Sequence, residues 1–113
     1  MVSGQGAYFQ VDAEVTSDWV DQTYSANHNF SAIPSLVRVT LVCIDSGGDA
    51  GISQNEELEI ASYGRPSQYG LTIYSSTTHT YARVDNNITV INSSGTIQDL
   101  DYTKWNFRFR LWK

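Results

Sequence analysis

Apolar and polar residues alternate along much of the chain, and this alternation predicts β-strands. The clearest stretch runs from Leu36 to Ile44, where both faces are largely apolar, so it predicts a strand in the centre of a sheet. The final strand is expected at residues 105–112, with an aromatic and aliphatic face buried and two arginines on the other face. Further strands are expected at residues 7–15, 24–30, 58–62, 70–75, 78–84 and 88–91. No convincing helical period interrupts this pattern.

Turn-forming residues separate the expected strands. Three glycines within residues 46–51 predict a loop, and Asp85-Asn86-Asn87 predicts a tight hairpin between the strands at 78–84 and 88–91. Short strands with frequent turn signals are typical of an all-β sandwich or a small barrel. We therefore predict an all-β fold, an antiparallel β-sandwich of about six to eight short strands. Residues 7–113 are expected to form this single β-sandwich domain, after a flexible lead at residues 1–6.

Composition narrows the class of protein. A chain of 113 residues has the length of one domain, which leaves no room for a catalytic module beside a binding module. The net charge of −5 is divided unevenly, because residues 1–60 carry nine acids and one base, whereas residues 61–113 carry six bases and three acids. We interpret this as complementary halves that fold together, or complementary subunits that meet. The arginines are scattered over separate strands, so no nucleic-acid partner is expected.

The ionisable residues give little sign of metal chemistry. The run from Asp45 to Glu56 has acids at the first, fifth and twelfth positions of a calcium-type loop. However, Gly47 and Ala50 stand where an EF-hand needs an oxygen ligand and a glycine. A solvated acidic loop is therefore expected, with a calcium site of another type as the alternative. No histidine or cysteine spacing suits zinc, so no metal site and no cofactor are expected.

Catalysis and membrane insertion are not expected either. Cys43 alternates with valine and leucine, which favours a small buried hydrophobe over a nucleophile. No nucleophile motif is present, so we predict a protein that is not an enzyme. The alternative is an acid–base site formed by two carboxylates that are distant in the sequence and close in the fold. No apolar run approaches the ~18 residues of a membrane span.

Several tyrosines fall at strand ends or on outward faces, namely Tyr63, Tyr69, Tyr74 and Tyr81. Exposed rings beside hydrogen-bonding groups can stack on sugars or contact proteins. This gives Tyr63, Arg65 and Tyr69 as candidate ligand-binding residues. The default alternative is ordinary pairing of aromatic side chains across neighbouring strands.

Two segments carry a resemblance to a known family. Residues 33–43 (Ile-Pro-Ser-Leu-Val-Arg-Val-Thr-Leu-Val-Cys) are followed by residues 50–58 (Ala-Gly-Ile-Ser-Gln-Asn-Glu-Glu-Leu). Together they resemble a small β-domain of tailed-bacteriophage tail and appendage proteins, in which a proline-led strand precedes an Ala-Gly-Tyr-Ser-x-Gly-Asp-Glu turn. Ile52 replaces the usual aromatic residue, and Asn55-Glu56 replace Gly-Asp. Residues 105–112 resemble the family's terminal Trp-x-x-x-x-Arg-x-Trp strand.

This resemblance implies a non-enzymatic virion structural or appendage domain, in a tail fibre, a tail tip or a head decoration. Its expected partners are copies of itself, as a homotrimer, and other virion proteins, with contact to a host receptor as a further role. Its expected location is the phage particle, after synthesis in the bacterial host cytoplasm. The layout is also similar to H-type lectins, six-stranded sandwiches that trimerise and bind N-acetylgalactosamine. The alternative is therefore a carbohydrate-binding module that contacts a host-surface glycan, although no lectin contact motif can be placed on this sequence.

Overall fold

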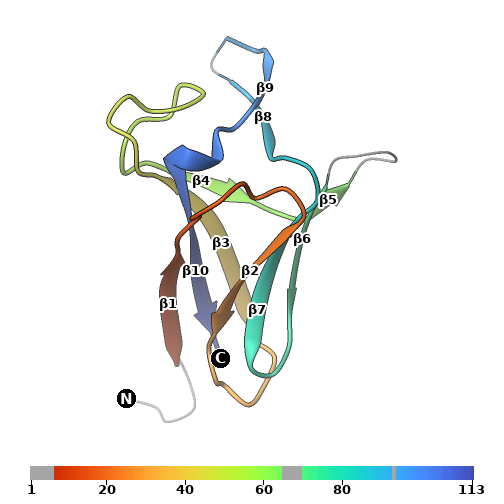
Figure 1. Ribbon diagram of the computed structural model, residues 1–113. Helices are drawn as coiled ribbons and strands as arrows, with labels where there is room; N and C mark the ends of the chain where they lie inside the picture. The colour runs from red at the N-terminus through yellow and green to blue at the C-terminus, as the bar shows by residue number, and fades with distance from the viewer. Residues whose placement is uncertain (1–6, 65–69, 93) are drawn as a thin grey trace.

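The strands form two four-stranded sheets and a separate two-stranded hairpin (Figure 1). The computed structural model describes residues 7–64, 70–92 and 94–113, so the expected lead at 1–6 lies outside the described residues. The first sheet has the order β1 (Tyr8–Ala13), β10 (Trp105–Trp112), β3 (Leu36–Cys43) and β4 (Glu57–Ile60). The second has the order β2 (Gln22–Asn27), β7 (His79–Val84), β6 (Gly70–Ser75) and β5 (Tyr63–Gly64). The hairpin consists of β8 (Thr89–Ile91) and β9 (Ile97–Asp99), and the short 3-10 turn η1 (Tyr102–Lys104) leads into β10.

The prediction of an antiparallel, all-β sandwich is confirmed. The described strand pairs are antiparallel, and the inner faces of the two large sheets supply the hydrophobic core. Within the described ranges, no helix has the length and apolarity needed to cross a bilayer.

Strand β10 is central in the first sheet, since it pairs with β3 over its whole length and with β1 over residues 107–112. The alternating face predicted to be buried is fully inaccessible to solvent, and it consists of Trp105, Phe107, Phe109 and Leu111. At ~2–3 kcal/mol for each fully buried large side chain, this face contributes about 8–12 kcal/mol of transfer free energy. The fold therefore depends on the last strand of the chain.

Strand β3 is central, as the pattern of two apolar faces predicts, because it lies between β10 and β4. Its inner face is apolar, and on its outer face Thr40 and Val42 are also buried. Cys43 is fully buried, which confirms that it acts as a small hydrophobe.

Ion pairs join the acidic first half of the chain to the basic second half. Arg83 pairs with Asp21, and Arg108 pairs with Asp12 at 2.7 Å between Nε and Oδ1. Arg110 pairs with Glu57, also at 2.7 Å. The interpretation that complementary halves fold together is thus confirmed by these contacts.

The hairpin predicted at Asp85-Asn86-Asn87 is wrong, because β8 pairs with β9 and not with β7. Strand β7 already has β2 on one edge and β6 on the other, so neither edge is vacant for β8. The side chain of Asn87 accepts hydrogen bonds from the indole Nε1 of Trp19 and from the backbone of Ile88. These bonds direct the chain inward, and Ile88 is 1% exposed.

Candidate functional site

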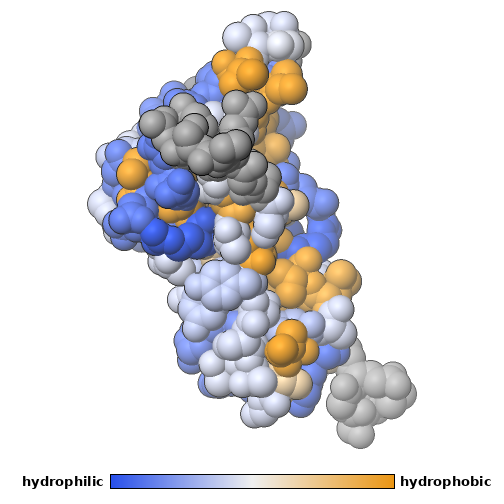
Figure 2. Space-filling view, turned by 90° about the vertical axis from the view of Figure 1, so that its right-hand side faces the viewer, coloured by the Kyte–Doolittle hydropathy of each residue, from blue (hydrophilic) through white to orange (hydrophobic). Residues whose placement is uncertain are grey.

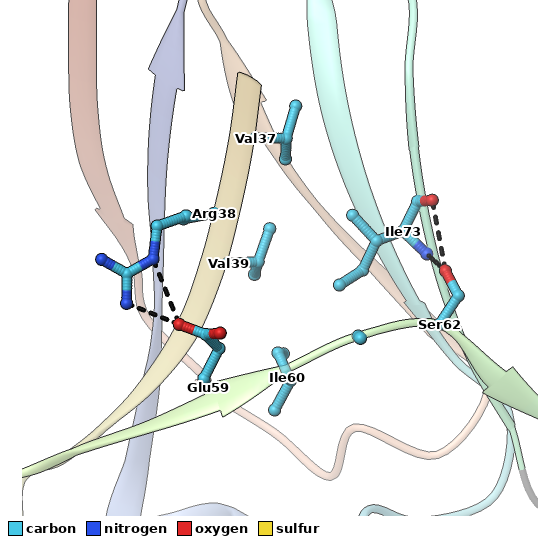
Figure 3. Close-up of a pocket in the computed structure, with 8 residues that line it drawn as sticks. Val37, Arg38, Val39, Glu59, Ile60, Ser62 and Ile73 are labelled. Atoms are coloured by element: carbon cyan, nitrogen blue, oxygen red, sulfur yellow. Dashed lines mark hydrogen bonds and ion pairs between the residues drawn. The ribbon is translucent and has the colours of Figure 1, made fainter.

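A groove opens between the two sheets on the flank where β4 and β6 face each other (Figure 3). Its volume is about 350 Å³. Apolar side chains from both sheets point into it, namely Val37, Val39, Ile60 and Ile73 (Figure 3). Pockets of roughly 300–1,000 Å³ with an apolar lining and few polar groups are the usual form of a binding site.

The groove exists because the strands on this flank are short. Strand β4 pairs only with residues 39–42 of β3, so residues 36–38 extend beyond its end. Strand β5 pairs only with residues 70–71 of β6. Between β4 and β5 the chain crosses from one sheet to the other through Ala61 and Ser62, both of which are exposed and line the groove. The sandwich is therefore open on the flank beside this crossing.

Polar groups are found at the rim of the groove. The Ser62 hydroxyl accepts a hydrogen bond from the Ile73 backbone N–H at 2.7 Å and donates to the Ile73 carbonyl at 3.3 Å. It thus makes the two backbone hydrogen bonds that a residue of a neighbouring strand would otherwise make to Ile73. On the opposite side, both Nε and Nη2 of Arg38 donate to Oε1 of Glu59. The rim charges cancel, so the groove suits aliphatic groups or an uncharged chain segment.

The outer face of the first sheet carries a compact ionic network. The Glu57 carboxylate accepts two hydrogen bonds from Arg110, at 2.7 and 2.8 Å, and one from the Thr40 hydroxyl at 2.7 Å. Arg108 lies 3.3 Å from the same carboxylate and also forms two bonds to Asp12. The hydrogen bond from Arg110, with those from Thr40 and the two positive charges, lowers the pKa of Glu57 to about 2, against the effect of burial. The network stays ionised at neutral pH and joins all four strands of the first sheet, β1, β10, β3 and β4.

Aromatic rings stack on the outer face of the second sheet. Tyr74 and Tyr81 are cross-strand partners whose ring centroids lie 4.7 Å apart, and His79 stacks on Tyr81 at 5.6 Å. Ser25 and Asn27 are the partners of Tyr81 and His79 on β2. The cross-strand pairing named as the default is confirmed for the two tyrosines, and Tyr74 is still 47% exposed. We call these three rings the aromatic ladder.

The acidic loop at residues 45–56 has a structural role. Oδ2 of Asp49 accepts hydrogen bonds at 2.9 Å from the buried indole Nε1 of Trp105 and from the backbone of Asp101. The other two acids cap turns, since Asp45 accepts from the Gly47 backbone and Glu56 accepts from the Ser53 backbone. The expectation of a merely solvated loop is therefore wrong for Asp49, which joins this loop to the start of β10.

Metal-ligating groups are dispersed in the part of the chain that the structure describes. No three histidine, cysteine, aspartate or glutamate side chains lie together there in a way that could hold a metal ion. His28 is buried, with Nδ1 accepting from the Phe30 backbone at 3.0 Å and Nε2 lying 3.1 Å from the Ser76 carbonyl oxygen. Its two ring nitrogens are thus occupied in holding a loop against the turn between β6 and β7.

The candidate residues taken from the sequence stay untested. Arg65 and Tyr69 lie outside the described residues, and for Tyr63 the structure describes only the backbone, which pairs with Leu71. The groove was missed by sequence reasoning, although the small residues Ala61 and Ser62 directly after a strand are a signal that the chain changes sheet there.

Comparison of the chain with protein-family profiles, with curated proteins and with solved structures finds no match in any of the three.

Proposed function

We propose that this chain is a structural or appendage domain of a tailed-bacteriophage virion, in a tail fibre, a tail tip or a head decoration. It is non-enzymatic, and it assembles with copies of itself and with other virion proteins. The resemblance at residues 33–43, 50–58 and 105–112 supports this proposal. These segments include β3, β10 and the first two residues of β4, which are neighbours in one sheet, so the resemblance covers a contiguous part of the fold.

The observation that carries the assembly role is the open flank of the sandwich. Protein interfaces commonly combine an apolar centre with a polar rim. The groove has this arrangement, with aliphatic side chains inside and the Arg38–Glu59 pair and Ser62 at its edge. Short edge strands beside it leave room for a neighbouring chain, and a sheet edge is a common place for one protein to add to another.

Sedimentation velocity tests the assembly role. A homotrimer has three times the monomer mass of 12.6 kDa, and its fraction should rise with protein concentration. A species that remains monomeric up to about 1 mM, where even weak contacts with dissociation constants near that value are populated, contradicts self-assembly. The virion assignment has a separate test, since a tail or capsid gene should lie beside the coding sequence.

A second candidate function, a carbohydrate-binding module, is supported by the aromatic ladder. Exposed rings offer apolar area at low entropic cost, and the neighbouring Ser25 and Asn27 can hydrogen-bond to hydroxyl groups. A glycan array tests this function. Reproducible binding that Tyr74→Ala abolishes supports it, whereas an array without binding contradicts it.

The array experiment has a matched control and a test of the original candidates. Tyr8 is as exposed as Tyr74, at 47%, but it lies on the other sheet, so Tyr8→Ala should leave glycan binding unchanged. Loss of binding in Tyr63→Ala or Tyr69→Ala, with Tyr74→Ala unaffected, would instead place the sugar at the residues singled out from the sequence.

A further inference from the structure

Among the described residues, the outer face of the second sheet carries no net charge around the aromatic ladder. Neither residues 22–27 nor residues 70–82 contain aspartate, glutamate, lysine or arginine. The next outward residue of β7, Arg83, is neutralised by its ion pair with Asp21. Figure 2 looks onto the side of the molecule where β6 and β7 lie in Figure 1, and its lower half is mostly pale, the colour of intermediate hydropathy. This face is therefore neither strongly ionic nor strongly apolar.

The three rings of the ladder are held in place by their neighbours. Nδ1 of His79 lies 2.8 Å from the Thr78 hydroxyl oxygen, and this hydrogen bond orients the imidazole at one end of the ladder. Tyr81 lies between the other two rings, since it stacks on both His79 and Tyr74. Rings that are already ordered lose little conformational entropy when a ligand stacks on them. The ladder is thus a pre-organised surface for the apolar face of a ring-shaped ligand.

Hydrogen-bonding groups lie beside the ladder on β2. Ser25 is the cross-strand partner of Tyr81, and Asn27 is the partner of His79. Both residues are exposed, and neither side chain is hydrogen-bonded to another residue in the part of the chain that the structure describes. The hydroxyl of Ser25 and the amide of Asn27 can therefore donate hydrogen bonds to a ligand and accept them from it.

This combination of rings and polar groups matches one chemical class of ligand. A sugar ring has an apolar face of C–H groups and a periphery of hydroxyl groups, so it can stack on the tyrosines and hydrogen-bond to their neighbours. An acyl chain has no hydroxyl groups to pair with Ser25 and Asn27. An acidic sugar would meet no unpaired cation among the described residues of this face, and the net charge of −5 opposes its approach. The surface therefore favours an uncharged sugar.

The positions of these groups also indicate the length of the ligand. Ser25 on β2 and Tyr74 on β6 lie on opposite sides of β7, and both are cross-strand partners of Tyr81. At roughly 4.8 Å between neighbouring strands, this row is about 10 Å long. One sugar ring is shorter than the row, whereas two linked rings can reach from the tyrosines to Ser25 and Asn27.

We propose that the outer face of β6, β7 and β2 binds an uncharged glycan of at least two sugar rings, which lies across the strands. One ring stacks on Tyr74 and Tyr81, and the next ring is hydrogen-bonded by Ser25 and Asn27. This inference rests on the second candidate function, the carbohydrate-binding module, and it specifies the charge, the length and the direction of the bound glycan.

An array of neutral and acidic glycans tests the charge and the length. It carries glucose, galactose, mannose and N-acetylglucosamine as mono-, di- and trisaccharides, each beside a counterpart that contains a uronic or sialic acid. Neutral di- and trisaccharides should bind, and the monosaccharides and acidic counterparts should bind at least about tenfold more weakly. Binding that is confined to acidic glycans, or that is equal for mono- and disaccharides, refutes this inference but leaves the carbohydrate-binding function standing. An array without binding contradicts both.

Two variants test the placement, by calorimetric titration with the neutral trisaccharide that binds most tightly on the array. Kd should rise about tenfold in Tyr81→Ala, which loses the central ring. It should rise about fivefold in Asn27→Ala, which leaves all three rings in place and loses one hydrogen-bonding group. Asn27 is exposed, so the circular dichroism spectrum of this variant should match that of the wild type.

Gln10→Ala is the matched control for Asn27→Ala. Gln10 also has an exposed amide on an edge strand, but it lies on β1 of the first sheet. Its Kd for the same trisaccharide should remain within about twofold of the wild-type value. If Asn27→Ala binds the trisaccharide as tightly as Gln10→Ala does, the glycan does not extend across β7 to β2 and the proposed placement is overturned.

Discussion

Replacing Glu57 by glutamine should weaken the fold in a pH-dependent way. In the folded protein the pKa of Glu57 is about 2, against an ordinary value of 4.5, because Arg110, Thr40 and Arg108 all stabilise its ionised form. A difference of this size corresponds to about 3 kcal/mol of stability, at 1.36 kcal/mol for each tenfold change. The side chain is 30% exposed, so solvent screening reduces the expected contribution to about 2 kcal/mol.

The direction of the pH effect follows from the lowered pKa. A carboxylate that is more acidic in the folded state stabilises the fold fully above pH 4.5, and this contribution is lost as the pH falls toward 2. The wild type should therefore exceed Glu57→Gln by about 2 kcal/mol at pH 6. The two proteins should converge as the pH is lowered to about 2.

Urea unfolding followed by tryptophan fluorescence measures this difference, because Trp19 and Trp105 are almost fully buried. Glu59→Gln is the matched control, since Glu59 is on the same strand and pairs with Arg38 while both side chains are largely exposed. The control should lose less than about 1 kcal/mol at any pH. If Glu57→Gln loses no more than the control, or if its loss is the same at pH 6 and pH 3, the reasoning about the network is refuted.

Three further changes test the packing. Deleting residues 104–113 removes the strand that pairs with both β1 and β3, so the circular dichroism spectrum should be that of an unfolded chain. Asp49→Ala should lower the free energy of unfolding in urea by about 1–3 kcal/mol, because it leaves a buried indole N–H without an acceptor, while Asp45→Ala should cost less. Gly48→Ala should lower Tm more than Gly95→Ala. Both glycines have positive φ, but only at Gly48 would an added Cβ lie 2.5 Å from a backbone oxygen.

Local alternation was enough to predict the elements that form the core. The strand at 70–75 has the predicted bounds, and the buried faces of β3 and β10 follow the predicted period. Pairing between strands was less predictable, because it depends on which sheet edges are vacant. The hairpin predicted at Asp85-Asn86-Asn87 shows this. Its residues favour a turn, but both edges of β7 are already paired, with β2 and β6, so β8 cannot pair with it.

The groove could not be predicted for a related reason. It arises from the relative lengths of β3, β4 and β5, and no pattern within a single strand records the length of its partner. Strand β9 was equally hidden, because no alternating pattern in the sequence indicated a strand at its position. The pairing of Tyr74 with Tyr81, by contrast, follows from two outward tyrosines on consecutive strands.

Hydrogen exchange at two protein concentrations tests the assembly role most directly. The account predicts that amides in the concentrated sample gain protection at the groove, in residues 36–39, 59–62 and 72–75. Amides in β2 and β7, on the far edge of the second sheet, should exchange equally in both samples. Exchange that is the same at both concentrations throughout the chain would contradict the claim that this domain assembles through its open flank.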